Sequence, residues 1–119
     1  IKLLIIKLLI IKLLIIYLYL YIIIMSHTQY TDYQNYFKTK NSIFYYNQAI
    51  KLQEAGSVDY TLISKTFYKA IILNKNNIDA QQSIRKMIDD TQITAEECIS
   101  AKTSARGELL QCYSVTDLN

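Results

Sequence analysis

The sequence predicts an all-α fold: a short array of antiparallel helical hairpins with flanking capping helices, preceded by a low-complexity apolar N-terminal segment. Proline is absent and glycine occurs only at Gly56 and Gly107, whereas all-β folds need both residue types for frequent tight turns. After residue 28, apolar side chains recur three and four positions apart, which is the spacing of one helix face. At 119 residues the chain has the length of one small domain.

Residues 1–24 form the low-complexity segment. The block Ile-Lys-Leu-Leu-Ile occurs three times in succession, and an alternation of Tyr and Leu and a run of Ile follow it. On a helix, Lys2, Lys7 and Lys12 would point in three widely separated directions. The segment therefore lacks the polar stripe of an amphipathic helix that lies on a membrane surface.

Two interpretations of this segment stay open. Residues 5–24 match the roughly 20 residues needed to cross a bilayer, and fifteen Ile and Leu at about −0.5 kcal/mol each outweigh Lys12 at about +3 kcal/mol. In that case we expect a membrane anchor with the rest of the chain facing the cytoplasm. Alternatively the repeat is a leader produced by replication slippage or engineering, and translation begins at Met25.

We expect a helical domain over residues 25–114, beginning with two helices. Aromatic side chains three and four positions apart predict the first helix over residues 28–40. Asn41 or Ser42 would cap a second helix, which Gly56 would end in the left-handed conformation. The aromatic residues of the first helix are Tyr30, Tyr33, Tyr36 and Phe37.

Three more helices are expected downstream. Ser57 or Asp59 would cap the third, which ends at the turn-forming run of residues 74–77. The fourth covers residues 78–91. A capping box predicts the start of a fifth helix, because Thr94 and Glu97 can each accept a hydrogen bond from the other's free backbone N–H.

The end of the fifth helix is less regular in sequence. Gly107 is expected to weaken this helix by about 1 kcal/mol relative to Ala and to be a point where it divides. Residues 115–119 are expected to fray as a short tail.

The charge distribution argues against nucleic-acid binding. The net charge of +3 comes from Lys2, Lys7 and Lys12, and from Met25 onward ten basic residues face ten acidic ones without a basic stripe. Nucleic acid is therefore not an expected partner.

The reactive residue types predict neither an enzyme nor a metal site. His27 is the only histidine, so no histidine-based metal cluster or serine triad can form. Cys98 and Cys112 are expected to be buried, reduced thiols, which favours the cytoplasm. We expect no cofactor and no small-molecule substrate.

Residues 43–80 resemble one degenerate helix-turn-helix unit of the tetratricopeptide repeat family, most clearly over residues 43–77. The strongest match is the segment from Phe67 to Asn77, which reads like the second helix and exit turn of such a repeat. Lys75 stands where the family usually has proline. The resemblance implies that two antiparallel helices pack through Tyr45, Ala49, Leu52, Ile63, Phe67 and Ala70.

The three-helix microtubule-interacting and trafficking domain is a second resemblance. Its second and third helices also show Ala, a Gly turn and a Tyr-x-x-Ala-like close. The Asn-rich exit and the renewed helix at Ile78 favour the tetratricopeptide repeat, because they imply that the array continues.

These observations predict a scaffold or adaptor that binds a peptide or helix of another protein. The proposed groove consists of Tyr46, Asn47, Ile50 and Gln53, which alternate with the packing face of their helix. The alternative is a membrane-anchored helical subunit of a larger assembly.

Overall fold

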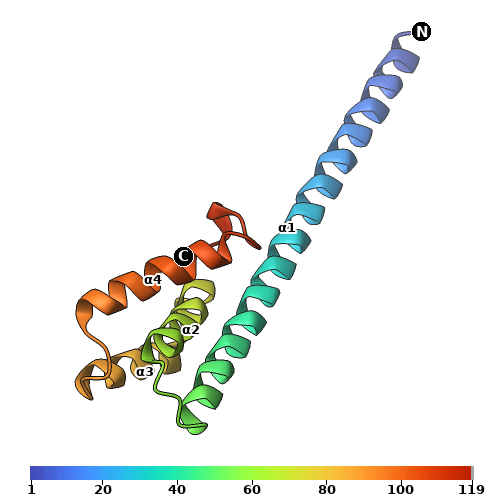
Figure 1. The fold of residues 1–119 in the computed structure, drawn as a ribbon. Coiled ribbons are helices and arrows are strands. Elements are labelled where there is room, and N and C mark those ends of the chain that lie inside the picture. Colours follow the sequence, from blue (N-terminus) through green and yellow to red (C-terminus); the bar gives the residue numbers. More distant parts are fainter. Residues whose placement is uncertain (119) are drawn as a thin grey trace. The chain divides into compact units, whose positions relative to one another are not determined.

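The structure, a computed structural model, describes residues 1–118, and every regular element among them is helical (Figure 1). The expected all-α class is confirmed. The chain divides into two compact units, residues 1–36 and residues 37 onward. The elements are α1 (Lys2–Glu54), α2 (Tyr60–Leu73), α3 (Ile78–Asp89), α4 (Ala95–Leu109) and the 3-10 helix η1 (Val115–Asp117).

The first helix is continuous over 53 residues, so the predicted boundary near residue 41 was wrong. Neither Pro nor Gly interrupts residues 2–54. Asn41 and Ser42 do not cap a helix, because their side chains serve other elements. The Ser42 hydroxyl donates to the Ala70 carbonyl at 2.6 Å, and the Asn41 amide donates to the Tyr113 hydroxyl.

The N-termini of the three shorter helices are set by local side-chain caps. The carboxylate of Asp59 accepts a first-turn backbone N–H of α2, and the amide oxygen of Asn77 does the same for α3. Thr94 accepts from the Glu97 N–H at 3.2 Å, while Glu97 accepts from the Thr94 N–H at 3.2 Å. The predicted capping box is confirmed.

Two helices end in the left-handed backbone conformation. Gly56 follows α1 with φ of 75°, and Thr91 follows α3 with φ of 56°. At each end, the next residue donates its N–H five residues back along the chain, at 3.0 Å after Gly56 and 2.9 Å after Thr91. Glycine adopts this conformation without strain, whereas a β-branched residue is strained in it.

We expect opposite effects from exchanging residue types at these two ends. Thr91→Gly should raise the free energy of unfolding by up to about 1 kcal/mol, because it removes the strain of a left-handed threonine. Gly56→Ala should lower it by about 1–2 kcal/mol, although nothing lies within 4 Å of the added methyl group. Urea unfolding followed by circular dichroism measures both. Shifts of the same sign would show that backbone conformation does not control these ends.

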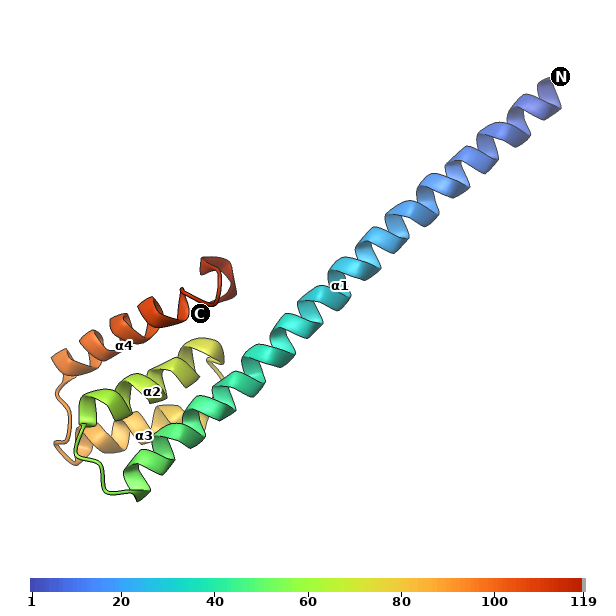
Figure 2. The same ribbon diagram turned by 45° about the vertical axis from the view of Figure 1, so that its right-hand side comes forward.

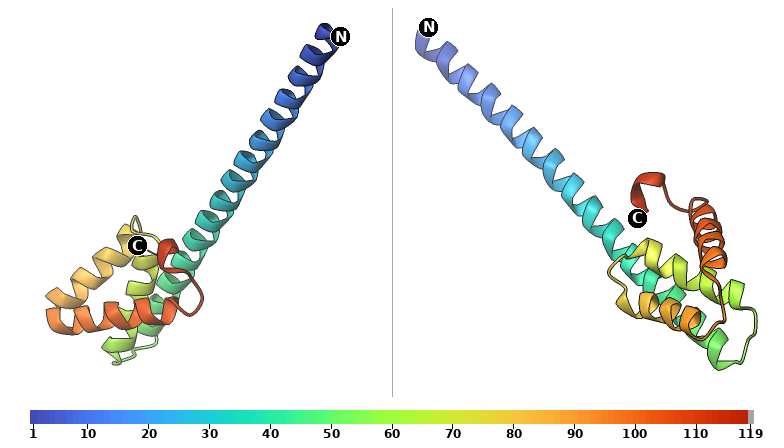
Figure 3. Two further views of the ribbon diagram at one scale, coloured as in Figure 1. Left: turned by 90° about the horizontal axis from the view of Figure 1, so that it is seen from above. Right: turned by 90° about the vertical axis from the view of Figure 1, so that its left-hand side faces the viewer.

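The unit from residue 37 onward is organised around α2. This helix packs most extensively on α4 and then on α3, which lie beside it in Figures 2 and 3. On α4, the buried side chains facing the core include the small residues Cys98, Ala101 and Ala105, which let the two helix backbones approach closely. Gly107 lies within α4, which continues to Leu109 without dividing.

The end of the described chain forms a 3-10 turn with contacts to the helices. Ser114 donates to the Asp117 carboxylate at 2.6 Å across η1, and Lys38 donates to the Asp117 carbonyl at 2.7 Å. Leu118 is 9% exposed and packs in a core cluster with Leu109. These contacts connect residues 115–118 to α1 and α4. The expected fraying of the tail stays a prediction. Residue 119 lies outside the described residues.

Candidate protein-binding surface

The residues predicted to pack the helix pair come together in one core cluster. Ala49, Ile63, Phe67 and Ala70 are at most 1% exposed and belong to the same cluster. Tyr45 and Leu52 are half-buried, and both pack against that cluster. The last part of α1 and the whole of α2 thus share a core. Whether this pair belongs to a tetratricopeptide repeat stays a prediction.

A buried polar contact ties α1 to the turn between α2 and α3. Ser42 is 0% exposed and donates to the Ala70 carbonyl, while its oxygen accepts from the side-chain amide of Asn77 at 2.9 Å. The amide oxygen of Asn77 accepts from the Ala80 N–H at 3.2 Å and thereby caps α3. Hydrogen bonds at Ser42 therefore join α1, α2 and the cap of α3. Among residues 1–118, every buried side-chain nitrogen or oxygen atom has a hydrogen-bond partner.

Beside this contact lies a surface hollow of about 420 Å³, which we call the asparagine hollow. Its apolar lining includes Ile43 on α1 and Ile78 at the start of α3, which are 53% and 60% exposed. Asp79 is the only Asp, Glu, Lys, Arg or His among the residues lining it. The lining is Thr39, Ile43, Tyr46, Asn47, Asn74, Asn76, Asn77, Ile78 and Asp79.

The structure separates the four residues predicted to form one groove. Tyr46 and Asn47 line the asparagine hollow, whereas Gln53 lines a different hollow of about 400 Å³ near Gly56. Ile50 packs against the core cluster and lines neither hollow. The prediction treated the residues as neighbours on one face, but the turn after α2 covers only the half of that face near Tyr46.

Tyr46 has a structural role as well as a surface one. It is half-buried, and its ring centroid lies 5.8 Å from that of Phe67, with the two planes tilted by 49°. A substitution at Tyr46 therefore disturbs the core and the hollow together. Asn47 is exposed and has no such contact with the core cluster.

Sequence reasoning missed the wall of the hollow formed by the turn after α2. Asn74, Asn76 and Asn77 were read as a helix boundary, which they are, but not as part of a surface. Their position against α1 depends on the hydrogen bond between Asn77 and Ser42. No local pattern marks that bond, because its two residues are 35 positions apart.

The tyrosines and the acidic residue near the second core cluster have perturbed titrations. Burial, followed by the nearby Tyr113, raises the pKa of Tyr45, and burial, followed by a hydrogen bond with Cys98, raises the pKa of Tyr68. Both phenols are therefore neutral at physiological pH. Lys69 lies 5.3 Å from the centre of the Tyr45 ring, which suits a cation–π contact.

Glu108 on α4 forms ion pairs with two lysines of α2, at 3.2 Å from Lys69 and 3.3 Å from Lys65. A hydrogen bond from Lys69 is the main reason that the pKa of Glu108 lies below 4.5. A lowered carboxyl pKa stabilises the fold at neutral pH and ceases to do so as the pH falls through it. Because Glu108 is 43% exposed, its stabilising effect is about 1 kcal/mol or less.

The cysteines only partly match their prediction. Both are free thiols, and Cys98 is buried. Cys112 is exposed, because α4 ends at Leu109 and the helical spacing that predicted a buried position does not extend to residue 112. His27 is exposed. Among residues 1–118, no group of three or more His, Cys, Asp or Glu is placed to hold a metal ion.

No protein-family model, curated protein or solved structure matches the chain.

Proposed function

We propose that the unit from residue 37 onward is a protein-interaction module that binds a peptide segment of another protein in the asparagine hollow. The observation that carries this proposal is the exposure of Ile43 and Ile78 in a hollow that Asn side chains also line. Protein interfaces combine apolar contacts of this kind with hydrogen bonds from polar groups.

The lining suits the chemistry of a peptide. An Asn side chain offers both a donor and an acceptor, so it can bond the N–H and C=O groups of a peptide backbone. Ile43 and Ile78 provide apolar contact for one side chain of the bound segment. Asp79 is the only acidic or basic residue in the lining, and its negative charge favours a segment that carries Lys or Arg.

The hollow is also held in shape before any partner binds. Asn77 is fixed at once by its bond to Ser42 and by its role in capping α3, and Tyr46 is fixed by the Phe67 ring. A preformed site loses little conformational entropy on binding. The resemblance to tetratricopeptide repeats agrees with an adaptor role, since such repeats present surfaces of this kind to other proteins.

A displayed library of random peptides tests the proposal on the full-length chain. Peptides enriched on the protein should bind the double variant Ile43→Asp, Ile78→Asp at least about tenfold more weakly, since the variant places charge on both apolar contacts. Ile99→Asp is the matched control, because Ile99 is 69% exposed on α4 and does not line the hollow.

The peptide experiment has one folding control and two results that would contradict the proposed site. Circular dichroism should show the same helix content for the double variant and the control, because both substituted surfaces are exposed. Equal affinity of the peptides for the protein and the double variant would contradict the proposal. Failure to enrich any peptide from a library that includes Lys- and Arg-containing sequences would contradict it too.

A further inference from the structure

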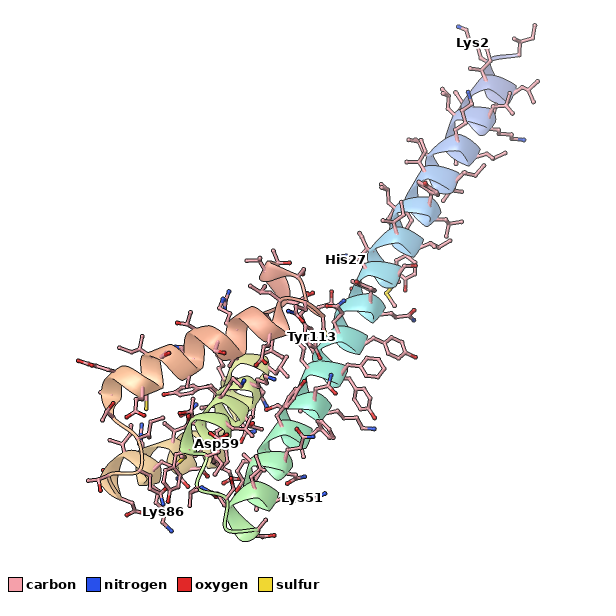
Figure 4. All side chains as sticks on the ribbon, in the orientation of Figure 1. Lys2, His27, Lys51, Asp59, Lys86 and Tyr113 are labelled. Carbon is pink, nitrogen blue, oxygen red and sulfur yellow. The ribbon has the colours of Figure 1, made fainter. Side chains whose placement is uncertain are left out.

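The helical segment from Leu3 to Met25, which we call the apolar segment, is exposed along its whole length. The exposed fraction of its large apolar side chains runs from 43% at Met25 to 73% at Leu3. Figure 4 shows side chains projecting on all sides of this part of α1. Soluble monomers rarely expose contiguous apolar patches larger than a few hundred Å². The apolar segment therefore needs a nonaqueous environment.

The positions of the three lysines around the helix show which nonaqueous environment fits the apolar segment. At about 100° per residue, Lys7 lies about 140° around the helix from Lys2, and Lys12 a further 140° around. No side of the apolar segment is polar. It therefore lacks the apolar stripe and opposite polar face of a helix in a soluble bundle, and it lacks the separate polar and apolar faces of a helix that lies on a membrane surface. An environment that surrounds the helix fits this pattern.

The length of the apolar segment matches a bilayer. Its 23 residues span about 34 Å at about 1.5 Å per residue, against a hydrocarbon thickness of about 30 Å. A helix satisfies its backbone hydrogen bonds internally, which the bilayer interior requires. Residues 13–25 carry no ionisable residue other than tyrosine, and the polar Ser26 and His27 follow at once.

The lysines and tyrosines are compatible with insertion. Lys7 lies about 6 Å along the axis from Leu3, within reach of the interface for a side chain that extends along the helix. Lys12 is the one charge near the middle, and the Ile and Leu residues around it outweigh it. Tyr21 lies about 6 Å from the Met25 end, close to the interfacial level where tyrosine is common.

We propose that residues 3–25 cross a lipid bilayer as a single helix and anchor the chain in the membrane. This inference is independent of the proposed peptide site, because it uses only residues before the second compact unit. The segment is long and apolar enough to span a bilayer, and all of its residues are exposed in the structure.

The test uses full-length chain synthesised with vesicles of phosphatidylcholine, a lipid without net charge. The chain should float with the vesicles, resist extraction by alkaline carbonate and stay bound at high salt. Trypsin should cleave after Lys12 at least about tenfold more slowly with vesicles than without, while cleavage after the exposed Lys75 is unchanged.

A matched pair of variants makes the test specific. Ile16→Lys with Leu20→Lys adds two charges near the middle of the apolar segment and should reduce the floated fraction at least about tenfold. Gln82→Lys with Ser100→Lys adds the same charge at exposed positions of α3 and α4 and should float like the parent chain.

Other environments for the apolar segment give different results. Binding only to anionic vesicles at low salt would show a surface-bound helix and overturn the proposal. Discrete oligomers that form equally without vesicles and do not float would show that a second copy covers the segment, and would overturn it as well. A chain that stays monomeric and soluble in carbonate would also overturn the proposal.

Discussion

Replacing Phe67 by alanine should lower the free energy of unfolding by about 3–5 kcal/mol, the range for deleting a buried aromatic ring. Phe67 is 0% exposed and is the largest fully buried side chain among the described residues. Its cluster includes residues of α1, α2, α3 and α4, so the cavity would open in the core that these four helices share. Urea unfolding of the full-length chain in a mild nonionic detergent, followed by circular dichroism, measures the loss.

Phe44→Ala is the control for this prediction, because it makes the same change at a side chain that is 54% exposed. Its only ring contact given by the structure is with Tyr45, at 5.5 Å, so we expect a loss of about 1.5 kcal/mol or less. Comparable losses at the two positions would contradict the placement of Phe67 at the centre of the core.

The three shorter helices were predictable because their boundaries are encoded locally. Asp59, Asn77 and Thr94 each bond a backbone N–H within three residues, so the signal lies within one turn of sequence. Gly56 is equally local, because its positive φ favours glycine whatever surrounds it. Patterns of this kind can be read without any knowledge of the tertiary structure.

The continuous α1 was not predictable from the same kind of signal. Asn41 and Ser42 are residues that favour caps, and a sequence alone does not show that Tyr113 and Ala70 occupy their hydrogen-bonding groups. Those partners lie 72 and 28 positions away along the chain. The local preference for a cap was therefore overridden by tertiary contacts.

The candidate surface was half predicted for a related reason. Tyr46 and Asn47 were found by helical periodicity, which places them beside the packing face. Periodicity also placed Ile50 and Gln53 there, but it does not show where the turn after α2 crosses α1. That crossing is set by Ser42 and Asn77, and it limits the hollow to the part of α1 that precedes Ile50.

Replacing Ala49 by leucine should destabilise the unit by about 1–3 kcal/mol, the range for overpacking a well-packed core. Ala49 is 0% exposed and shares a cluster with Phe67 and Ala70, so the added carbon atoms have no free space and α1 must move away from α2. Urea unfolding in nonionic detergent gives the free-energy change.

The same change at Ala95 isolates the effect of close packing from that of adding apolar surface. Ala95 is exposed at the first position of α4, so Ala95→Leu should alter the free energy of unfolding by about 0.5 kcal/mol or less. If Ala49→Leu is equally harmless, Ala49 is not closely packed against the cluster that contains Phe67 and Ala70. If it is harmful, the small side chain near the C-terminal end of α1 is there because Ala49 packs closely against the core cluster at that residue.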